Sequence, residues 1–290
     1  MLAGCGLAWG STQSLGKIAV STGHGHFGLL FWQLAIGALL MGALMALRRR
    51  PVVLTRRALT FGVVVAVVGT LIPGTVFYIS VARLPAGIMS ILISAVPILA
   101  FPIALALGQD RVSAGRLAGL LCGLMGVVLI ALPGASLPSA AMAAWVPFAL
   151  IGPLFYAMES NFVGRFGMAG MDPAQAMFLA SLIGAALALP LALGTGQWVD
   201  LLAPWGAAEW ALLAGAVVHV LTYAAFVWLA ANAGSVFASQ CSYIVTASGL
   251  VWAAMLLGES VSPVVLAALA LMLGGLFLVS PRERAPAVAA

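Results

Sequence analysis

The sequence predicts an all-α membrane protein with ten transmembrane helices in two inverted five-helix repeats. Three observations lead to this prediction. Of the 290 residues, 64% are hydrophobic and 7% are charged; the basic residues gather on alternate sides of successive apolar runs; and the second half of the chain resembles the first. A soluble domain of this composition would expose a largely apolar surface, whereas lipid solvates such side chains.

The apolar runs have the length that a bilayer requires, which is about 20 mostly apolar residues per helix. Turn-forming and charged stretches separate them, for example GHGH at 23–26, RRRPVVLTRR at 48–57 and GESVSP at 258–263. Division on this basis predicts spans at 3–20, 27–47, 58–81, 86–107, 115–132, 144–164, 174–194, 207–230, 236–257 and 263–280.

Basic residues indicate how these spans are oriented. One side of the membrane holds Arg48, Arg49, Arg50, Arg56, Arg57, Arg111, Arg116, Arg165, Arg282 and Arg284, and the other holds Lys17 and Arg83. Because Lys and Arg are enriched in cytoplasmic loops, the first side is expected to be cytoplasmic. Both termini then lie in the cytoplasm, with the helices in a bacterial inner membrane, and this requires an even number of spans.

The two halves align at a shift of 147 residues, which becomes 149 after the fourth span. The matched pairs include Phe31 and Phe178, Gly37 and Gly184, Thr75 and Thr222, Ala86 and Ala233, Gly87 and Gly234, and Asp110 and Glu259. Chance matches among abundant Ala, Gly and Leu are the alternative, but they do not produce a near-constant offset. The predicted units are 1–135 and 144–282, with a cytoplasmic tail at 283–290. Five crossings per unit leave the second unit inverted relative to the first.

Two long stretches carry a family resemblance. LPAGIMSILISAVPILAFPIALALGQDRVSAGRLAGLLCGLMGVVLIA and ANAGSVFASQCSYIVTASGLVWAAMLLGESVSPVVLAALALMLGGLFLVS resemble the C-terminal parts of the two EamA repeats of the drug/metabolite transporter superfamily, and LAWGSTQSLGK resembles the opening of the first repeat. The GQDR and ANAG segments depart from the usual pattern. The resemblance implies a central cavity built from spans one to four and six to nine, with the fifth and tenth outside it.

Ionisable residues inside spans are costly and need a partner, a cavity or a route to the interface. Glu159 is either a proton-coupling or substrate-amine group, or a carboxylate at the cytoplasmic mouth that is solvated or held by Arg165. Lys17 either snorkels to the outer interface or contacts a carboxylate there. His219 is either bonded to a neighbouring helix or titrates as part of the site. Glu159 and Lys17 are the candidate coupling or gate residues.

Aromatic and polar residues concentrate in the spans that the resemblance assigns to the cavity. Uncharged hydrogen-bonding groups on aromatic walls suit an amphiphilic, zwitterionic or neutral solute, although part of the set is expected to join helices or lie at the interface. Ser90 and Ser94, one turn apart, are expected to share a face. The substrate-binding candidates are Trp9, Ser11, Gln13, Tyr78, Ser90, Ser94, Tyr156, His219, Tyr223, Ser239, Gln240 and Tyr243.

Small residues carry a packing prediction. Gly115, Gly119 and Gly123 recur every four residues in the fifth span and form a flat strip for close helix packing. Prolines inside spans each remove a backbone hydrogen bond and permit a kink; they are Pro73, Pro97, Pro102, Pro147, Pro153 and Pro190.

Several functions are disfavoured. Cys5, Cys122 and Cys241 lie in apolar runs, which argues against a disulfide framework or metal site, and His24 and His26 do not form a metal motif. No cofactor, nucleic acid or obligate protein partner is expected. A membrane-embedded enzyme would need paired acids, a metal motif or a nucleophile with its base, and neither an HExxH motif nor a second acid in the membrane near Glu159 is present.

The resemblance therefore implies a secondary transporter whose partners are a small-molecule substrate and the lipid bilayer. Several branches of the superfamily export amino acids, and the expected substrates are neutral or aromatic amino acids moved by alternating access. Drugs and purines are alternative substrates within the superfamily. A passive channel is an alternative of a different class, since it could use the same polar lining. Few internal positive charges argue against phosphorylated solutes such as nucleotide sugars.

Overall fold

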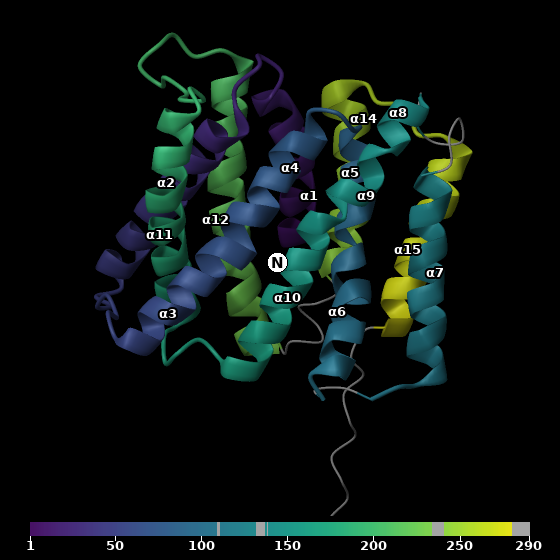
Figure 1. The fold of residues 1–290 in the computed structure, drawn as a ribbon, viewed down its shortest axis with the longest axis horizontal. Coiled ribbons are helices and arrows are strands. Elements are labelled where there is room, and N and C mark those ends of the chain that lie inside the picture. Colours follow the sequence, from purple (N-terminus) through teal and green to yellow (C-terminus); the bar gives the residue numbers. More distant parts are fainter. Residues whose placement is uncertain (109–110, 132–136, 138, 234–240, 280–290) are drawn as a thin grey trace, which may run out of the picture.

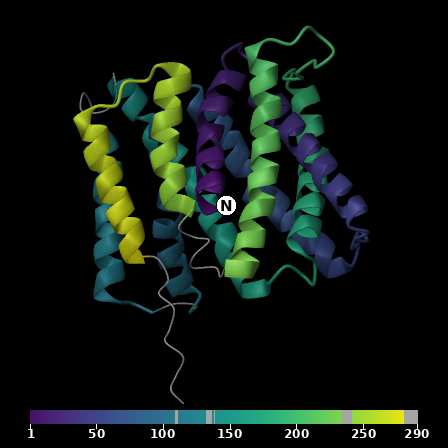
Figure 2. The same ribbon diagram turned by 180° about the vertical axis from the view of Figure 1, so that it is seen from behind.

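A computed structural model describes residues 1–108, 111–131, 137, 139–233 and 241–279. These residues form helices and connecting turns, with no strand in the described ranges, so the all-α prediction is confirmed. Figure 1 shows the helices side by side and roughly upright, and Figure 2 shows the opposite face of the same bundle.

The first half begins with α1 (Leu2–Ala19) and α2 (His26–Leu47). A continuous rod follows, in which α3 (Arg56–Val64) and α4 (Ile72–Val81) flank a π-helical segment, η1 (Val65–Leu71). The next rod consists of α5 (Ala86–Ile93) and α6 (Ala95–Ala106), and α7 (Ala114–Ala131) ends the half.

The second half begins with a rod of three pieces, α8 (Ala140–Ala143), α9 (Trp145–Ala149) and α10 (Ile151–Phe166). It continues with α11 (Pro173–Gly194) and α12 (Ala207–Ala233), and the described part ends with α14 (Cys241–Leu257) and α15 (Pro263–Val279). At the start of α11, the Asp172 side chain accepts from the Gln175 amide at 2.9 Å while the Gln175 side chain accepts from the Asp172 amide at 2.8 Å, a reciprocal cap that fixes where the helix begins.

Prolines account for the breaks within rods. The turn at Ser94 separates α5 from α6 three residues before Pro97, and the turn at Leu150 separates α9 from α10 three residues before Pro153. Each proline lacks the N–H that would bond four residues back, so the helix opens at that point. Pro73 follows η1 in the same way and lacks an N–H for the carbonyl of Gly69. A helix break or a π-helical segment therefore accompanies these three prolines, and a turn at Ala144 likewise precedes Pro147 by three residues; α6 and α11 continue through Pro102 and Pro190.

Seven helical stretches among the described residues are long and apolar enough to cross a membrane: 26–47, 56–81, 86–106, 114–131, 141–166, 173–194 and 207–226. α14 and α15 are apolar but shorter, and α1 carries four successive polar residues, Ser11 to Ser14, at its centre. The chain is thus a multi-pass helical protein, and the count of ten spans stays a prediction.

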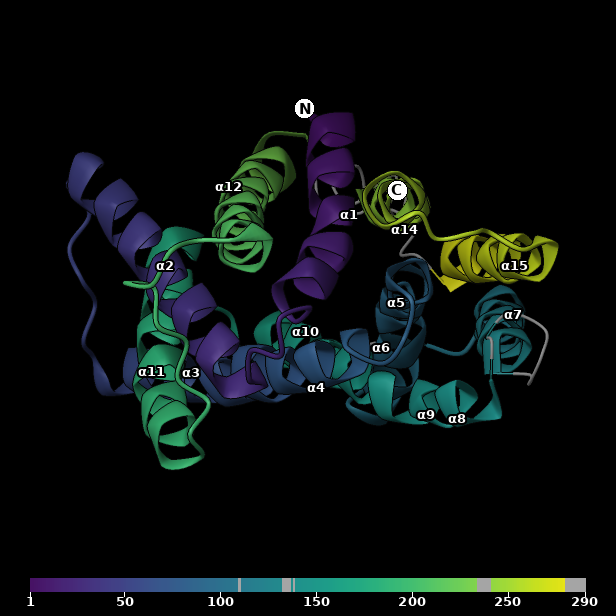
Figure 3. The same cartoon turned by 90° about the horizontal axis from the view of Figure 1, so that it is seen from above.

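The helix packing has the symmetry expected of a repeat. α2 packs on α11, α5 on α14 and α7 on α15, so equivalent spans meet their own counterparts. α1 packs on α12 and α14, just as α10 packs on α4 and α6. Seen from above, α2 and α11 lie at one edge of the molecule and α7 and α15 at the other (Figure 3). In Figure 1, α7 rises from the lower end whereas α15 descends from the upper end, which is the relation expected of inverted units.

The molecule has two chemically different ends. At the lower end in Figure 1, here called the arginine-rich end, the 48–55 segment meets the starts of α3 and α11 and the end of α10. There Gln175 donates to the Pro51 carbonyl at 2.8 Å, and Arg165 donates to the Leu107 carbonyl at 2.9 Å.

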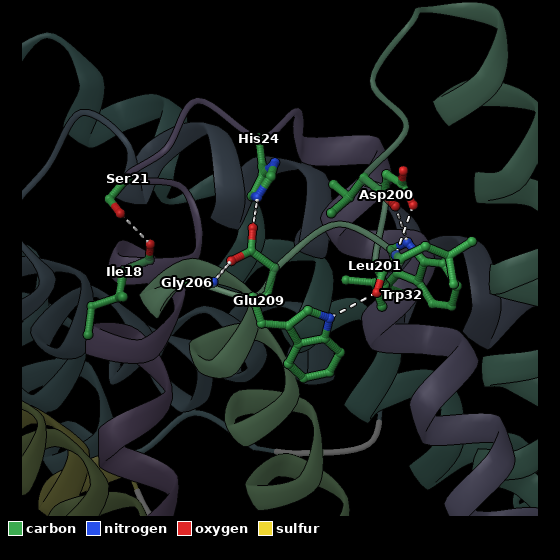
Figure 4. A network of polar contacts seen from close by, with 11 residues as sticks. Ile18, Ser21, His24, Trp32, Asp200, Leu201, Gly206 and Glu209 are labelled. Carbon is green, nitrogen blue, oxygen red and sulfur yellow. Dashed lines mark hydrogen bonds and ion pairs between the residues drawn. The ribbon is translucent and has the colours of Figure 1, made fainter.

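The opposite end carries a polar network between the two halves (Figure 4). His24, in the turn between α1 and α2, lies 2.6 Å from Glu209 in the first turn of α12. Trp32 donates to the Val199 carbonyl at 2.8 Å, which joins α2 to the segment before α12. Because each contact pairs a residue of one half with a residue of the other, the two halves are held together at this end.

Glycines bring α7 and α15 into close contact. A Cβ added at Gly119 would meet the Gly275 carbonyl, and one added at Gly275 would meet the backbone of Gly119 and Gly123. The glycine-strip prediction is confirmed for Gly119 and Gly123. It is wrong for Gly115, where a Cβ would meet nothing. This position lies in the first turn of α7, outside the contact with α15.

Candidate functional site

Two neighbouring cavities occupy the bundle between the halves. The outer cavity, of about 350 Å³, extends toward the end that holds the His24–Glu209 pair and is lined there by Ala19 and Leu212. The inner cavity, of about 250 Å³, extends toward the arginine-rich end and is lined there by Phe61 and Met168. Neither α7 nor α15 contributes a described lining residue, as the family resemblance implied for the fifth and tenth spans.

The outer cavity presents uncharged polar groups on aromatic and apolar walls. The Tyr78 hydroxyl donates to Gln33 Oε1 at 2.6 Å, so Tyr78 of α4 holds the side-chain amide of Gln33 on α2 in place. Thr12 and Ser94 also line this space, with hydroxyls bonded to the carbonyls of Trp9 and Ile91 at 2.7 Å. Each hydroxyl oxygen retains capacity to accept another hydrogen bond.

Gln13 is the least satisfied polar residue of the outer cavity. It is 9% exposed, and its Oε1 has no hydrogen-bond partner among the described residues. A buried amide oxygen without a partner costs free energy comparable to a lost hydrogen bond. Since Gln13 lines the cavity, a solute with an N–H or O–H donor would satisfy this oxygen.

Glu159 lines the inner cavity, and its carboxylate lies against Gly69 of η1. A Cβ at position 69 would collide with the carboxylate in this position, so any larger residue requires the end of the Glu159 side chain to move. The alternative in which Arg165 holds Glu159 is wrong: Arg165 donates to Leu107, and no ion pair or hydrogen bond of the Glu159 carboxylate occurs within the described ranges. Tyr223 of α12 lines the same cavity.

Four side chains line both cavities and so lie at the boundary between them, here called the wall: Trp9, Gln33, Tyr156 and His219. They come from α1, α2, α10 and α12, two from each half of the chain. Trp9 Nε1 donates to His219 Nδ1 at 3.2 Å, with the rings edge to face at 5.8 Å. His219 is thus bonded to a neighbouring helix, which was one of the two roles considered for it.

Several candidate residues lie outside both cavities. Ser11 bonds its own helix at Ala8, and Ser90 lies in the α5–α14 contact, where Gly249 packs against it. Ser94, which caps the end of α5, lines the outer cavity, whereas Ser90 lines neither cavity. Tyr243 lines neither cavity, although its neighbour Ser242 lines the outer one. Ser239 and Gln240 lie outside the described residues.

Lys17 lies at the outer end in a separate surface pocket with Glu259. Its ammonium donates to the Leu84 carbonyl at 2.9 Å, so a backbone oxygen is its observed partner. Glu259 accepts from the amides of Ala86 and Gly87 at 2.7 and 2.9 Å and thereby caps α5. The cap by Glu259 thus joins the two halves, whereas the Lys17 bond lies within the first half.

Gln33 is the principal cavity residue that the sequence analysis missed. It lines both cavities and is bonded to Tyr78. A signal was present, because Gln33 stands in the apolar run FWQLAIG, where an amide is as costly as the other polar residues that were singled out. Thr12, Thr70, Ser181 and Thr246 were also missed, and each lines one of the cavities.

Comparison with known proteins agrees with this architecture. The profile of the EamA-like transporter family matches residues 1–132 and 143–280. Seventeen solved chains match in structure. One, described only as the crystal structure of a protein, has a TM-score of 0.62 at 19% identity and covers 96% of this chain and 94% of its own, a likeness that concerns the fold alone. No curated protein sequence matches.

Proposed function

We propose that this chain, which belongs to the EamA-like transporter family, exports neutral and aromatic amino acids and related amphiphiles across the bacterial inner membrane. Transport is from the cytoplasm outward, and both termini lie on the cytoplasmic side. The observation that carries the substrate class is the outer cavity, which combines aromatic walls, uncharged hydrogen-bonding groups and an unpartnered Gln13 oxygen.

Each part of a zwitterion has a chemically suitable partner in this lining. Its ammonium can donate to Gln13 Oε1 and rest against the face of Trp9 or Tyr78, a contact worth about 0.5–2 kcal/mol. Its carboxylate can accept from the Thr12 or Ser94 hydroxyl after a change of rotamer. Its side chain meets Phe77 and Val245, an apolar wall on which one methylene discriminates by only about 1–3 kcal/mol. Selectivity among neutral amino acids should therefore be broad.

Alternating access fits the inverted arrangement of the halves. Two similar units that meet around a central space can exchange packings that open it to either side. A passive channel, the alternative from another class, would instead need a continuous open path. The wall of Trp9, Gln33, Tyr156 and His219 between the cavities favours a carrier.

The decisive experiment is transport by purified protein in proteoliposomes. Labelled amino acids, purines and a cationic drug are each tested with and without a pH gradient, against vesicles without protein. We expect faster flux of large neutral amino acids than in empty vesicles, and saturation of that flux. If no amino acid moves faster than in empty vesicles while a purine or drug does, the amino-acid proposal is wrong. Flux that never saturates and is symmetric would favour the channel.

A further inference from the structure

Among the described residues, one hydrogen bond joins wall residues of the two halves. Gln33 is held by Tyr78 of the same half, whereas Trp9 of α1 bonds His219 of α12. Trp9 also packs edge to face on Phe226 at 5.8 Å, so its indole lies against α12. No hydrogen bond of the Tyr156 hydroxyl occurs in the described part of the chain. The Trp9–His219 contact therefore does most to hold the wall together.

The Trp9–His219 hydrogen bond depends on the protonation state of His219. An indole N–H can only donate, so His219 Nδ1 must offer its lone pair. A histidine with protons on both nitrogens has no lone pair to offer, and it would bring an N–H against the N–H of Trp9. The bond consequently exists only while His219 is neutral.

The titratable side chains that line the two cavities come from three helices. Among the lining residues, α10 contributes Tyr156 and Glu159, α12 contributes Tyr223 and α4 contributes Tyr78. α1, α2, α11 and α14 contribute no titratable group to either lining within the described ranges. Glu159 is thus the one carboxylate in this set, and it lies in the cavity toward the arginine-rich end.

We propose that Trp9 and His219 form a gate between the inner and outer cavities, which is closed while His219 is neutral and released when His219 binds a proton. The gate rests on the proposed transport function, but it concerns access between the inner and outer cavities rather than the identity of the solute. In the closed state the indole blocks the path between the cavities. Release frees Trp9 to swing away from α12, which joins the cavities.

The test measures access to the cavities rather than transport. Cys5, Cys122 and Cys241 are replaced by alanine, and a single cysteine is introduced as Ser94→Cys in the outer cavity or Ala180→Cys in the inner one. A membrane-impermeant thiol reagent is applied from either side of oriented vesicles. Rates are normalised to Ser21→Cys in an exposed turn, which corrects for the effect of pH on thiol reactivity.

Two substitutions of the same histidine should act in opposite directions. His219→Leu cannot accept the indole hydrogen and should speed labelling of Ser94→Cys from the arginine-rich side roughly tenfold, a change of the size expected when one hydrogen bond is lost. His219→Gln retains an acceptor but cannot bind a proton, so labelling should stay slow at every pH. With His219 intact, labelling should rise as pH falls from about 7 to 4, because a buried imidazole binds a proton only in acid. Trp9→Phe should behave like His219→Leu.

Trp252→Phe is the matched control. It removes an indole N–H that donates to the Leu7 carbonyl at 2.8 Å, away from both cavities, and should leave labelling unchanged. The gate is refuted if His219→Leu and Trp9→Phe label like the parent, or if His219→Gln keeps the pH dependence. Because no solute is used, a protein that fails to move amino acids but shows this labelling pattern would retain the gate and lose only the proposed substrate.

Discussion

The α7–α15 pair and the central helices are built on opposite principles, although both contain small residues in apolar spans. In the α7–α15 pair, glycines bring two backbones together, and no described residue of either helix lines a cavity. In the centre, Gly69 leaves room for a carboxylate, and polar groups such as Gln13 Oε1 have no hydrogen-bond partner in the described part of the chain. The comparison indicates that the α7–α15 pair, here called the edge pair, is built for close packing, whereas the centre retains unsatisfied polar groups, as the proposed binding of a solute requires.

The strongest challenge to this comparison is a bulky residue in the edge pair. Gly119→Leu should reduce the free energy of unfolding by about 3 kcal/mol, at the upper end for overpacking, because the new side chain meets the Gly275 backbone, which cannot rotate away. Thermal unfolding in detergent measures this. Gly115→Leu is the control and should leave the melting temperature unchanged, since nothing lies near that position. Equal losses in both variants would contradict the assigned contact.

The next largest effect concerns Glu159. Glu159→Gln keeps hydrogen-bonding capacity but cannot titrate, so transport should lose its dependence on the pH gradient while the melting temperature is retained. Proteoliposome flux with and without the gradient measures this. Glu209→Gln, at the outer end beside His24, is the matched control and should keep the dependence. Gradient-driven flux that is unchanged in Glu159→Gln would return Glu159 to the role of a solvated carboxylate.

A smaller effect is expected at Gln13. Gln13→Leu removes an acceptor that lacks a protein partner, so the fold should lose little, while substrate affinity should fall roughly tenfold, as for one lost hydrogen bond. Competition binding and thermal unfolding are measured together. Ser90→Ala, in the α5–α14 contact outside both cavities, should leave affinity unaltered. A large loss of stability with unchanged affinity in Gln13→Leu would show a structural role instead.

The smallest effect should come from Gly69→Ala. Its added methyl group would meet the end of the flexible Glu159 side chain rather than backbone, so the melting temperature should change little. The carboxylate must move, however, and the pH at which gradient-driven flux is half-maximal should shift. A destabilisation as severe as that of Gly119→Leu would mean that Gly69 is required for packing, as Gly119 is.

The sequence was sufficient to predict the helices and much of their packing. The predicted limits 27–47, 174–194 and 207–230 differ by three residues or fewer from those of α2, α11 and α12. Gly119 and Gly123 were predicted to pack because their spacing places them on one face. These features depend on local periodicity and length, which are visible in a single chain.

The cavity was less predictable because it depends on rotation and breaks within helices. Ser90 and Ser94 share a face in a regular helix, yet α5 ends at Ile93 and only Ser94 lines the cavity. A polar residue within a span is conspicuous, but its sequence position does not say whether it faces a neighbouring helix, as Ser11 does, or open space. The partner of His219 is 210 residues away, and no spacing in the sequence predicts that pairing.

The cap on α5 has a consequence for biosynthesis. The amides of Ala86 and Gly87 find their acceptor in Glu259, which follows them by 173 and 172 residues. At about 5–20 residues per second, a ribosome takes roughly 10 to 35 s to reach that glutamate. Throughout that interval the start of α5 must rely on water or on headgroups of the bilayer. The first five-helix unit is therefore incomplete at one helix end until the second is nearly finished, which favours assembly of both units as a pair.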